Sequence, residues 1–521
     1  MRRIQLFFWI IIIFCSTLLI RCNDNGQFNA KKNTLDQPDL TSEEIKRLVL
    51  LDTNYAYPAA AARQDAITVA AELDAEDGKK GRNIHRTIAE TITISIQDTI
   101  RYPKTDRSRK NDPGFHIFNF ANNNGFAIIS GDKRAFGRLG WAEKGIVNGD
   151  SKINMFLSRA VRYLQSKRQE AEAMRGDKDY ISLLMKLANF KSKGISDKNN
   201  SSGRIECAPP NSRTSQTAPI SCSSQTTSTL VSTTNAIQTI VPALLKTAWN
   251  QNAPYNNNYG GSECGTRYDD CYLHANNNYF AGCTEIAEAQ VIAYFYGKNP
   301  AKYGTDWPII SNTNLACTLN SNQVSLVAGL VRQVYSNYNF TVHSCVFSSS
   351  SNANGTFTFP YPDNGISSTF GLVQGEWRSY NNGDLEASLM NGSPVPVYGT
   401  EHLLCLCVGL YIPFVGCAGY NACVGDPTVY HEWVIDGLQR VVTTSTYLIN
   451  PIDYCTCNPL PSYYASYATI TNSYTHYNWG WGGDSNGWYI EGSFGGPDTS
   501  GNYNVHSFNH DDNIIAYITP L

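Results

Sequence analysis

The amino-acid sequence predicts an α+β protein with more than one domain. With 521 residues the chain exceeds one ordinary domain and is long enough for two or three hydrophobic cores. Residues 23–200 alternate between helical and strand patterns, whereas strands outnumber helices from about Val241 onward. The later part is also poor in charge and rich in Tyr, Trp, Asn and Ser. That composition excludes a disordered or coiled-coil protein and argues against a nucleic-acid binder.

The net charge of −3 conceals two halves of opposite sign. Residues 1–210 contain 33 Lys and Arg against 24 Asp and Glu, while residues 211–521 contain 8 against 20. Opposite charges attract two surfaces most strongly at low salt. We therefore expect the basic half to dock on the acidic half; the alternative is two unrelated solubility patterns.

The first 22 residues predict export. Arg2 and Arg3 precede an apolar stretch that is short for a bilayer span and typical of a secretory signal. Residues 19–22 resemble a bacterial lipoprotein signal, in which Cys22 would receive lipid and tether the protein to a membrane. Arg21 departs from the small residue usual at its position, so ordinary signal cleavage and an uncleaved anchor stay open. We expect a periplasmic, outer-membrane surface or secreted protein.

The segment after the signal contains predicted elements of both kinds. Period-two alternation predicts strands, and an Asn-rich turn at 121–125 predicts a hairpin. The predicted elements are a helix opened by Thr41–Glu44, strands over 91–96, 115–120 and 126–130, and an amphipathic helix over 153–174. Residues 197–240 are then dominated by Ser, Thr, Asn and Pro, which predicts an exposed linker that is easily cut.

Thirteen of the 15 cysteines follow residue 206. In an exported protein such density indicates disulfides, and thirteen cysteines allow six pairs with one left over. A structural zinc site is disfavoured, because Cys405 and Cys407, like Cys455 and Cys457, are separated by one residue rather than two. The odd thiol is reactive, paired with another molecule, or accidental.

Cys283 occupies a position that would make a thiol reactive. Gly282 precedes it, and helix formers follow at once, predicting a helix over 283–296. A helix N-terminus favours the nucleophilic thiolate. At about 100° per residue, Glu285 and Glu288 lie far around the helix from Cys283, and we expect both to face water. The alternative is that Cys283 is half of a disulfide.

Among nine histidines, His431 is the best candidate base. It lies in an alternating strand over 430–437 that we expect to end in a turn, and a strand would hold the imidazole rigidly. Alone, such a histidine can equally be structural. Residues 476–483 and the turn 484–487 predict either a hairpin with packed indoles or an Asn and Trp that orient and shield an imidazole.

These residues carry a resemblance to the streptopain-like cysteine peptidases, bacterial secreted enzymes with a papain-like fold. The blocks stand in the order of that family and touch about 400 residues. They are residues 241–251 with 254–256, the helix start 281–290, a helix-to-strand block over 385–398, the strand around His431, and the Trp-rich segment 478–483. Residues 115–119, 125–130 and 139–141 resemble the inhibitory propeptide of the family.

The resemblance implies a role for each matching residue. Cys283 would be the nucleophile and His431 the general base and acid. Gln251 would stabilise the oxyanion beside the Cys283 backbone N–H, Asn478 would orient His431, and Trp479 would shield it. No metal or cofactor is needed for this chemistry.

The resemblance also implies a division of the chain. It comprises a signal peptide over 1–22, an inhibitory propeptide over 23–200, a Ser/Thr-rich linker with the maturation cleavage over 201–240, and a papain-like catalytic domain over 241–521. The fold class is therefore α+β, with a helical nucleophile side and an antiparallel sheet side, preceded by an α+β propeptide.

Several features depart from the family pattern. Residues 284–286 and Glu432 replace residues that are usually small. The stretch between His431 and Asn478, which contains Cys455 and Cys457, is unusually long, and residues 405–423 form another cysteine-rich insertion. Loops of this kind flanking a cleft change which substrates enter, so substrate preference does not transfer. His476 remains a reserve candidate for the base.

The expected function is that of an exported cysteine endopeptidase made as a zymogen. Its partners would be protein or peptide substrates and its own propeptide, with no nucleic acid. Two alternatives use the same fold: a catalytically inactive surface binder of glycan or protein, and an acyl transferase that uses the same Cys–His pair.

Overall fold

The computed structural model describes most of the chain between residues 40 and 491. The described residues are 40–52, 55–95, 113–135, 137–148, 154–174, 178–180, 182–183, 186, 227–260, 267–268, 271, 275–337, 341–342, 357–358, 369–373, 377–379, 382–400, 404–412, 416–424, 430–450, 452, 462–491, 513–515 and 519–520. The predicted signal, the lipidation site Cys22 and residues 187–226 lie outside them.

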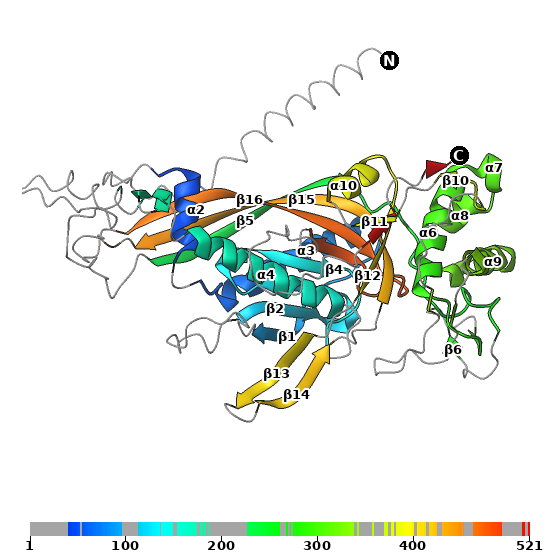
Figure 1. Cartoon of the computed structure of the whole chain (residues 1–521), viewed down its shortest axis with the longest axis horizontal. Helices are drawn as coiled ribbons and strands as arrows, with labels where there is room; N and C mark the ends of the chain where they lie inside the picture. The colour runs from blue at the N-terminus through cyan, green and yellow to red at the C-terminus, as the bar shows by residue number, and fades with distance from the viewer. Residues whose placement is uncertain are drawn as a thin grey trace, which may run out of the picture.

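One antiparallel sheet organises the described residues (Figure 1). Its order is β1-β2-β3-β4-β17-β16-β15-β12-β18-β11, and β5 also pairs with β15. The strands are β1 (Ile88–Ser95), β2 (Pro113–Phe120), β3 (Phe126–Ser130), β4 (Arg138–Ala142), β5 (Thr227–Val241), β11 (Trp377–Ser379), β12 (Val395–Thr400), β15 (Tyr430–Asn450), β16 (Tyr463–Asn478), β17 (Gly487–Ile490) and β18 (Asn513–Ile515). Strands from the two ends of the sequence thus meet where β4 pairs with β17.

Helices lie at both ends of this sheet. In Figure 1, α6, α8 and α9 gather at the right, whereas α2 lies across the far end of β16 and β5. The helices are α2 (Ser42–Leu50), α3 (Ala59–Lys79), α4 (Asn154–Met174), α6 (Cys283–Lys298), α7 (Pro300–Tyr303), α8 (Trp307–Ser311), α9 (Ser321–Asn337) and α10 (Asn382–Met390). The mixed composition confirms the α+β class, and none of the described helices is long and apolar enough to cross a membrane.

The elements predicted for the N-terminal half are confirmed. Helix α2 begins with a capping box: the Glu44 N–H donates to the Thr41 hydroxyl, and the Thr41 N–H donates to the Glu44 carboxylate. The hairpin between β2 and β3 turns through Asn122 and Asn123, whose φ angles of 60° and 56° asparagine tolerates better than most residues. Helix α3, which the sequence analysis did not predict, packs on β2 and β3.

The predicted linker is only partly a linker. Residues 227–241 form β5, which pairs with β15 from Thr227↔Asn450 to Val241↔Leu438. The Thr, Val and Ile content of this segment favours a strand, which explains why a Ser/Thr-rich composition was a poor guide. Most of its side chains are half-buried or exposed, as expected for an edge strand.

Strand β15 is longer than predicted. It does not end in a turn at Gly437 but continues to Asn450, with an irregular register between Ile435 and Gly437. Together with β16 and β5 it forms a three-stranded extension, which accounts for the long stretch that departs from the family pattern.

Two hydrophobic cores lie on opposite faces of β15. Trp433 and Ile435 belong to a core shared with β1–β4 and the N-terminal helices. Val434, between them in sequence, belongs to a second core built on α6, α8 and α9. Because alternate residues of a strand face opposite sides, β15 is buried on both faces here.

Smaller two-stranded ladders complete the described structure. They are β6 (Arg267–Tyr268) with β7 (Ala275–Asn276), β8 (Thr341–Val342) with β9 (Phe357–Thr358), β10 (Leu372–Val373) with β19 (Thr519–Pro520), and β13 (Leu404–Ile412) with β14 (Gly416–Val424). Cys405 stands opposite Cys423 in the β13–β14 register. This hairpin lies within the cysteine-rich insertion that the sequence analysis identified.

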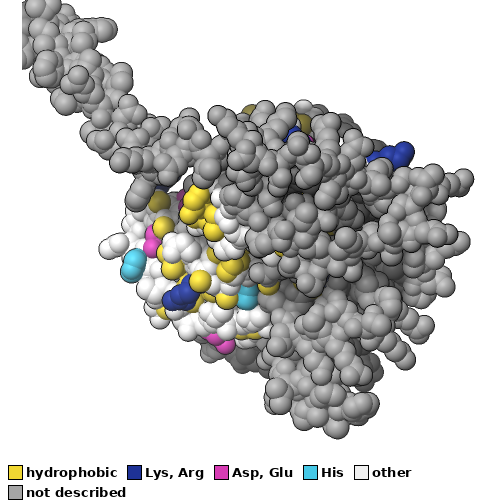
Figure 2. Space-filling model, turned by 90° about the vertical axis from the view of Figure 1, so that its left-hand side faces the viewer, with side chains coloured by type: hydrophobic (Ala, Val, Ile, Leu, Met, Phe, Trp, Pro, Cys, Tyr) yellow, Lys and Arg dark blue, Asp and Glu magenta, His cyan; other side chains and the backbone are white. Residues whose placement is uncertain are grey.

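The described surface in Figure 2 is mainly neutral. Charged side chains there are few and separated, and hydrophobic side chains occur in small groups between polar ones. This described part of the face therefore presents no broad charged patch that would steer a highly charged ligand.

Because of buried His116, we predict that the folded protein is less stable in acid. It is 4% exposed, its Nδ1 lies 3.0 Å from the Thr93 hydroxyl, and its Nε2 has no hydrogen-bond partner among the described residues. Burial lowers the pKa of His116 below its usual value, so the unfolded chain binds the proton first as pH falls. The free energy of unfolding should therefore decrease below pH ~6.5, by at most about 1.4 kcal/mol per pH unit.

Urea unfolding at about pH 7.5 and 5.5 measures this effect. The loss of stability in acid should shrink in His116→Gln and persist in His85→Gln, whose side chain is 87% exposed. An equal acid dependence in both variants would assign the effect to other groups.

Candidate active site

Cys283 is the first residue of α6. Gly282 precedes it as N-cap in an extended conformation, with φ −74° and ψ 159°, and makes no side-chain cap. The predicted helix start is therefore confirmed. Cys283 is a free, half-buried thiol, whereas Cys271 and Cys317 form a disulfide. The other cysteines after residue 240 lie outside the described residues or have side chains that are not described.

His431 lies near the start of β15, opposite Gly399 of β12. Its neighbour Glu432 directs its backbone N–H toward the Cys283 sulfur, as does Thr284. The first turn of α6 and the beginning of β15 therefore meet at the thiol. The structure thus places Cys283 at the backbone of β15, beside the residue that follows His431.

The protonation of His431 follows from its hydrogen bond. Its Nε2 lies 3.0 Å from the Trp479 carbonyl oxygen, which can only accept. We therefore assign the proton to Nε2, which makes Nδ1 the basic nitrogen of the neutral ring. The orienting group is the backbone of Trp479, and a base fixed in one tautomer is what thiol activation requires.

Three indoles enclose the His431 ring. Trp481 stacks closest, at 4.7 Å between ring centroids, while Trp479 and Trp433 lie at 6.0 and 6.1 Å. Trp479 is itself stacked on Trp481 at 5.1 Å. The sequence assigned the shield to Trp479, and the structure adds Trp481 as the nearer ring.

Asn478 bonds to a neighbouring glutamine. Its amide donates to the Thr247 carbonyl at 2.7 Å and to Gln290 Oε1 at 3.2 Å, and its own oxygen accepts from the Gly480 N–H. Its predicted role in orienting His431 stays a prediction. In this structure Asn478 fixes the start of the Trp-rich segment to α6 and to residue 247.

Gln290 is a positioning residue that sequence reasoning missed. Its Oε1 also accepts from the Thr247 hydroxyl at 3.0 Å and the Trp249 N–H at 3.2 Å, and the residue is fully buried. The signal was available, since Gln290 follows Cys283 by seven residues and so lies on nearly the same face of α6.

Gln251, the predicted oxyanion residue, bonds through its backbone to the segment that precedes Cys283. Its carbonyl accepts from the Ala281 N–H at 3.0 Å, two residues before Cys283, and its side chain is mostly buried. The contact places the segment around 251 beside the helix start. The oxyanion role itself stays a prediction.

The expectation that Glu285 and Glu288 face water is wrong. Both are buried, as is Glu432, at no more than 1% exposure each. Helical spacing gave their angle from Cys283 but not the surroundings, and α6 is covered from Thr284 to Phe295 by β15, β12, α8 and α9. Gly282 leaves room for the Glu285 carboxylate, which a Cβ there would overlap.

Two of these carboxyl groups, those of Glu432 and Glu285, work against thiolate formation. Burial raises the pKa of Cys283 to about 12, and the negative charges of Glu432 and Glu285 add to this, although the N–H groups of Glu432 and Thr284 oppose it. Burial also raises the pKa of Glu432 well above its usual value, followed by the charge of Glu288. In this conformation the sulfur is therefore a thiol at neutral pH, in contrast to the thiolate expected from the helix terminus alone.

Replacing the Glu432 carboxyl, whose negative charge when ionised raises the pKa of Cys283, should make Cys283 more reactive. In Glu432→Gln we expect alkylation of Cys283 by iodoacetamide at about pH 8.5 to accelerate roughly threefold to tenfold, the latter corresponding to one pKa unit. Alkylation rate against pH, followed by mass spectrometry, measures the shift. Glu386→Gln, which alters a carboxylate paired with Arg440 at 3.1 Å, serves as control. An unchanged profile in Glu432→Gln would contradict the electrostatic account.

His476, the reserve base, lies in a different setting. Its Nδ1 is 2.6 Å from the Asp436 carboxylate, and its ring meets Trp488 edge-on at 5.1 Å. The other Asp436 oxygen accepts from the Leu245 N–H. This histidine therefore ties β15, β16 and residue 245 together, away from the Cys283 contacts described above.

Residues 82–171 match the family model described as Spi protease inhibitor. This region includes all three blocks that resembled an inhibitory propeptide, so that part of the resemblance is supported. A search of curated proteins gave no match. The solved structures that are similar include a fragment of prointerpain A from Prevotella intermedia, with 16% identity and a TM-score of 0.35, covering 82% of this chain and 98% of that one.

Proposed function

We propose that the chain is the precursor of a cysteine endopeptidase with a papain-like catalytic half. The observation that carries the proposal is the position of the free Cys283 thiol, at a helix N-terminus and beside the strand of His431. The match of residues 82–171 to a protease-inhibitor family supports it independently, because an inhibitor joined to its target in one chain is the arrangement of a zymogen.

The proposed reaction uses groups of this chain alone. The thiol proton moves to Nδ1 of His431, and the sulfur forms a bond to the substrate carbonyl carbon. The carbonyl oxygen becomes an oxyanion, which the Gln251 side chain and the Cys283 backbone N–H stabilise. His431 then returns the proton to the leaving amine as the C–N bond breaks. Water, with His431 again as base, hydrolyses the thioester and restores the thiol.

The raised pKa of Cys283 fits a precursor. With a thiol pKa of about 12, little thiolate is present near neutral pH, so the described conformation is a resting state. Activation would require a change that brings His431 and Cys283 into an ion pair. We further propose that residues 1–22 export the protein and that Cys22 carries lipid; residues 23–200 would act as the inhibitory propeptide, and maturation cleavage would fall before Thr227, where β5 begins.

A thiol-directed peptidyl inhibitor tests the proposal. Applied to the processed protein, it should modify Cys283, and the processed protein should release new amino termini from a protein substrate. Cys283→Ala should show neither result. Labelling without new termini but with amide exchange would identify an acyl transferase. Absence of both labelling and turnover would contradict enzymatic function and leave a binding protein.

A further inference from the structure

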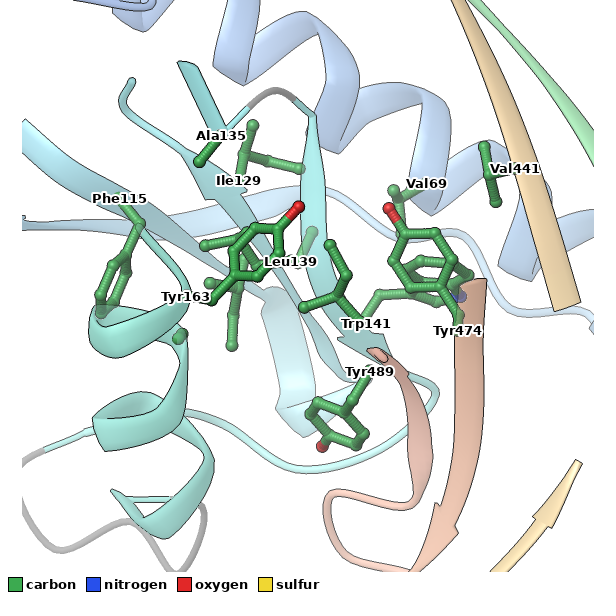
Figure 3. Close-up of a cluster of buried hydrophobic side chains, with 14 of the residues drawn as sticks. Val69, Phe115, Ile129, Ala135, Leu139, Trp141, Tyr163, Val441, Tyr474 and Tyr489 are labelled. Carbon is green, nitrogen blue, oxygen red and sulfur yellow. The ribbon is translucent and has the colours of Figure 1, made fainter. Parts of the chain in front are cut away.

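The N-terminal and C-terminal halves share one hydrophobic core. It joins Val69, Phe115, Leu139 and other residues before 184 to residues of β15, β16 and β17. Figure 3 shows Trp141 beside Tyr474, with Tyr489, Val69 and Val441 around them. A core of this kind is characteristic of the interior of one domain rather than of a transient contact between two.

Aromatic pairs connect the halves inside this core. The Trp141 and Tyr474 rings are 4.9 Å apart, and Phe156 of α4 lies 4.5 Å from Tyr489. Tyr474 and Tyr489 are at most 1% exposed, and the Tyr474 hydroxyl donates to the Arg138 carbonyl at 2.7 Å. Removing the N-terminal half would therefore expose two large rings and leave a buried hydroxyl without its acceptor.

The backbone joins the halves as well. Strand β4 adds to the edge of β17, with Trp141 opposite Trp488, and α2 packs on β16 and β5. Without β4, the β17 edge would present unpaired N–H and C=O groups. Near the beginning of β5, the buried Asp52 carboxylate accepts from the Ser228 N–H and hydroxyl, both at 2.7 Å. The contact surface thus runs from β17 to the beginning of β5.

Among the described residues, exposed charge contributes only at the edge of this surface, whereas the charges of Asp52 and Lys133, which bond to Ser228, are buried. Lys144 lies 3.6 Å from Asp484, and both side chains are about half exposed, at 52% and 49%. An exposed pair of this kind is weak and is screened by salt. The cohesion between the halves therefore rests on apolar burial and strand pairing, which salt does not screen.

We propose that the N-terminal domain, residues 40–186, is retained as a bound subunit after the chain is cut between 187 and 226. The mature protein is then a two-chain complex, and cleavage rather than departure of the domain is the event that regulates the site. This inference rests on one part of the proposed function, namely that the segment connecting the two halves is cut during maturation. Retention by apolar contacts differs from the expectation, drawn from the sequence, that opposite charge holds the propeptide.

Two glycines at the β4–β17 contact allow a sharp test. A Cβ on Gly487 would overlap the Trp141 carbonyl oxygen and lie 2.7 Å from the Ala142 Cα, so the atoms nearest to it belong to the N-terminal half. A Cβ on Gly140 would lie 2.7 Å from the Tyr489 ring. Gly487→Ala and Gly140→Ala thus disturb the same contact from opposite sides. Gly329→Ala in α9 is the matched control, since its Cβ would meet nothing within 4 Å.

The experiment uses the full chain with a site for a sequence-specific protease inserted between residues 201 and 210. After complete cutting, size-exclusion chromatography in low salt and in about 1 M salt should show both wild-type fragments in one peak in equal amounts. The Gly329→Ala fragments should behave alike, whereas the N-terminal fragment should be lost from the peak in Gly487→Ala. Gly140→Ala should show the same loss, and the uncut variants are checked for folding by circular dichroism.

Separate elution of the wild-type fragments in low salt would overturn the proposal, and so would separation confined to high salt. Labelling of Cys283 in the same fractions tests the proposed function independently. An unlabelled but intact complex contradicts the peptidase and leaves retention standing. Labelled Cys283 in a separated C-terminal fragment supports the peptidase and overturns retention.

Discussion

Replacing His431 with alanine should reduce peptide hydrolysis by about 10³-fold or more, because the reaction loses the group that accepts and returns the proton. Its Nε2 bond to the Trp479 carbonyl leaves Nδ1 as the base, and the backbone N–H of the next residue, Glu432, points at Cys283. The measurement is kcat/KM on a peptide substrate, with the processed form of each variant.

His476→Ala is the matched control that the chain provides. This histidine lies on the neighbouring strand and pairs with Asp436, and we expect hydrolysis to remain within about threefold of wild type because no step of the reaction uses it. Each variant is first compared with wild type by thermal unfolding, since loss of the His476 contact with Asp436 costs stability. Activity retained in His431→Ala and lost in a folded His476→Ala would reverse the assignment of the base.

Replacing Asp52 with alanine should destabilise the folded chain by about 3–5 kcal/mol, the cost of leaving a buried charge without its partner. Asp52 is 1% exposed and its Oδ2 lies 3.0 Å from the ammonium of Lys133, which is 2% exposed. Ser228 of β5 bonds to both groups, and its carbonyl accepts from Lys133 at 3.0 Å. Urea unfolding measures the loss.

Two further variants separate the charge from the packing. The double variant Asp52→Leu with Lys133→Met removes both charges and should recover most of the stability, since a buried pair is often replaceable by apolar residues. Glu170→Ala removes a half-exposed partner of Lys167 and should cost less than about 1 kcal/mol. A cost for Asp52→Ala as small as that for Glu170→Ala would contradict burial of the pair.

The features that could be predicted from the sequence depend on residues that are close together in the chain. The capping box at Thr41 and Glu44, the Asn-rich turn after β2 and the helix start at Gly282 each depend on a few consecutive residues, and each is found where expected. The free thiol of Cys283 also agrees with the odd cysteine count. These signals suffice to select Cys283 and the strand of His431 as candidates.

What could not be predicted depends on neighbours distant in sequence. Helical angles could not show that Glu285 and Glu288 are buried, because the layers covering α6 come from residues 307–337 and 395–450. The composition of residues 227–240 predicted a linker, although these residues pair with β15 and form a strand. The Gln290 contacts likewise needed the positions of residues 247, 249 and 478.

The order of strands in the sheet also sets an order of assembly. The hydrogen bond from Tyr474 to Arg138 joins residues 336 positions apart, so β4 is synthesised long before the strands that complete its edge. At a synthesis rate of about 5–20 residues per second the interval is roughly 20 to 70 seconds. During it the nascent N-terminal half presents an open strand edge, which is prone to wrong pairing. Once β17 has been synthesised, it pairs with this open edge of β4. The half of the chain made first therefore directs the folding of the half that contains Cys283.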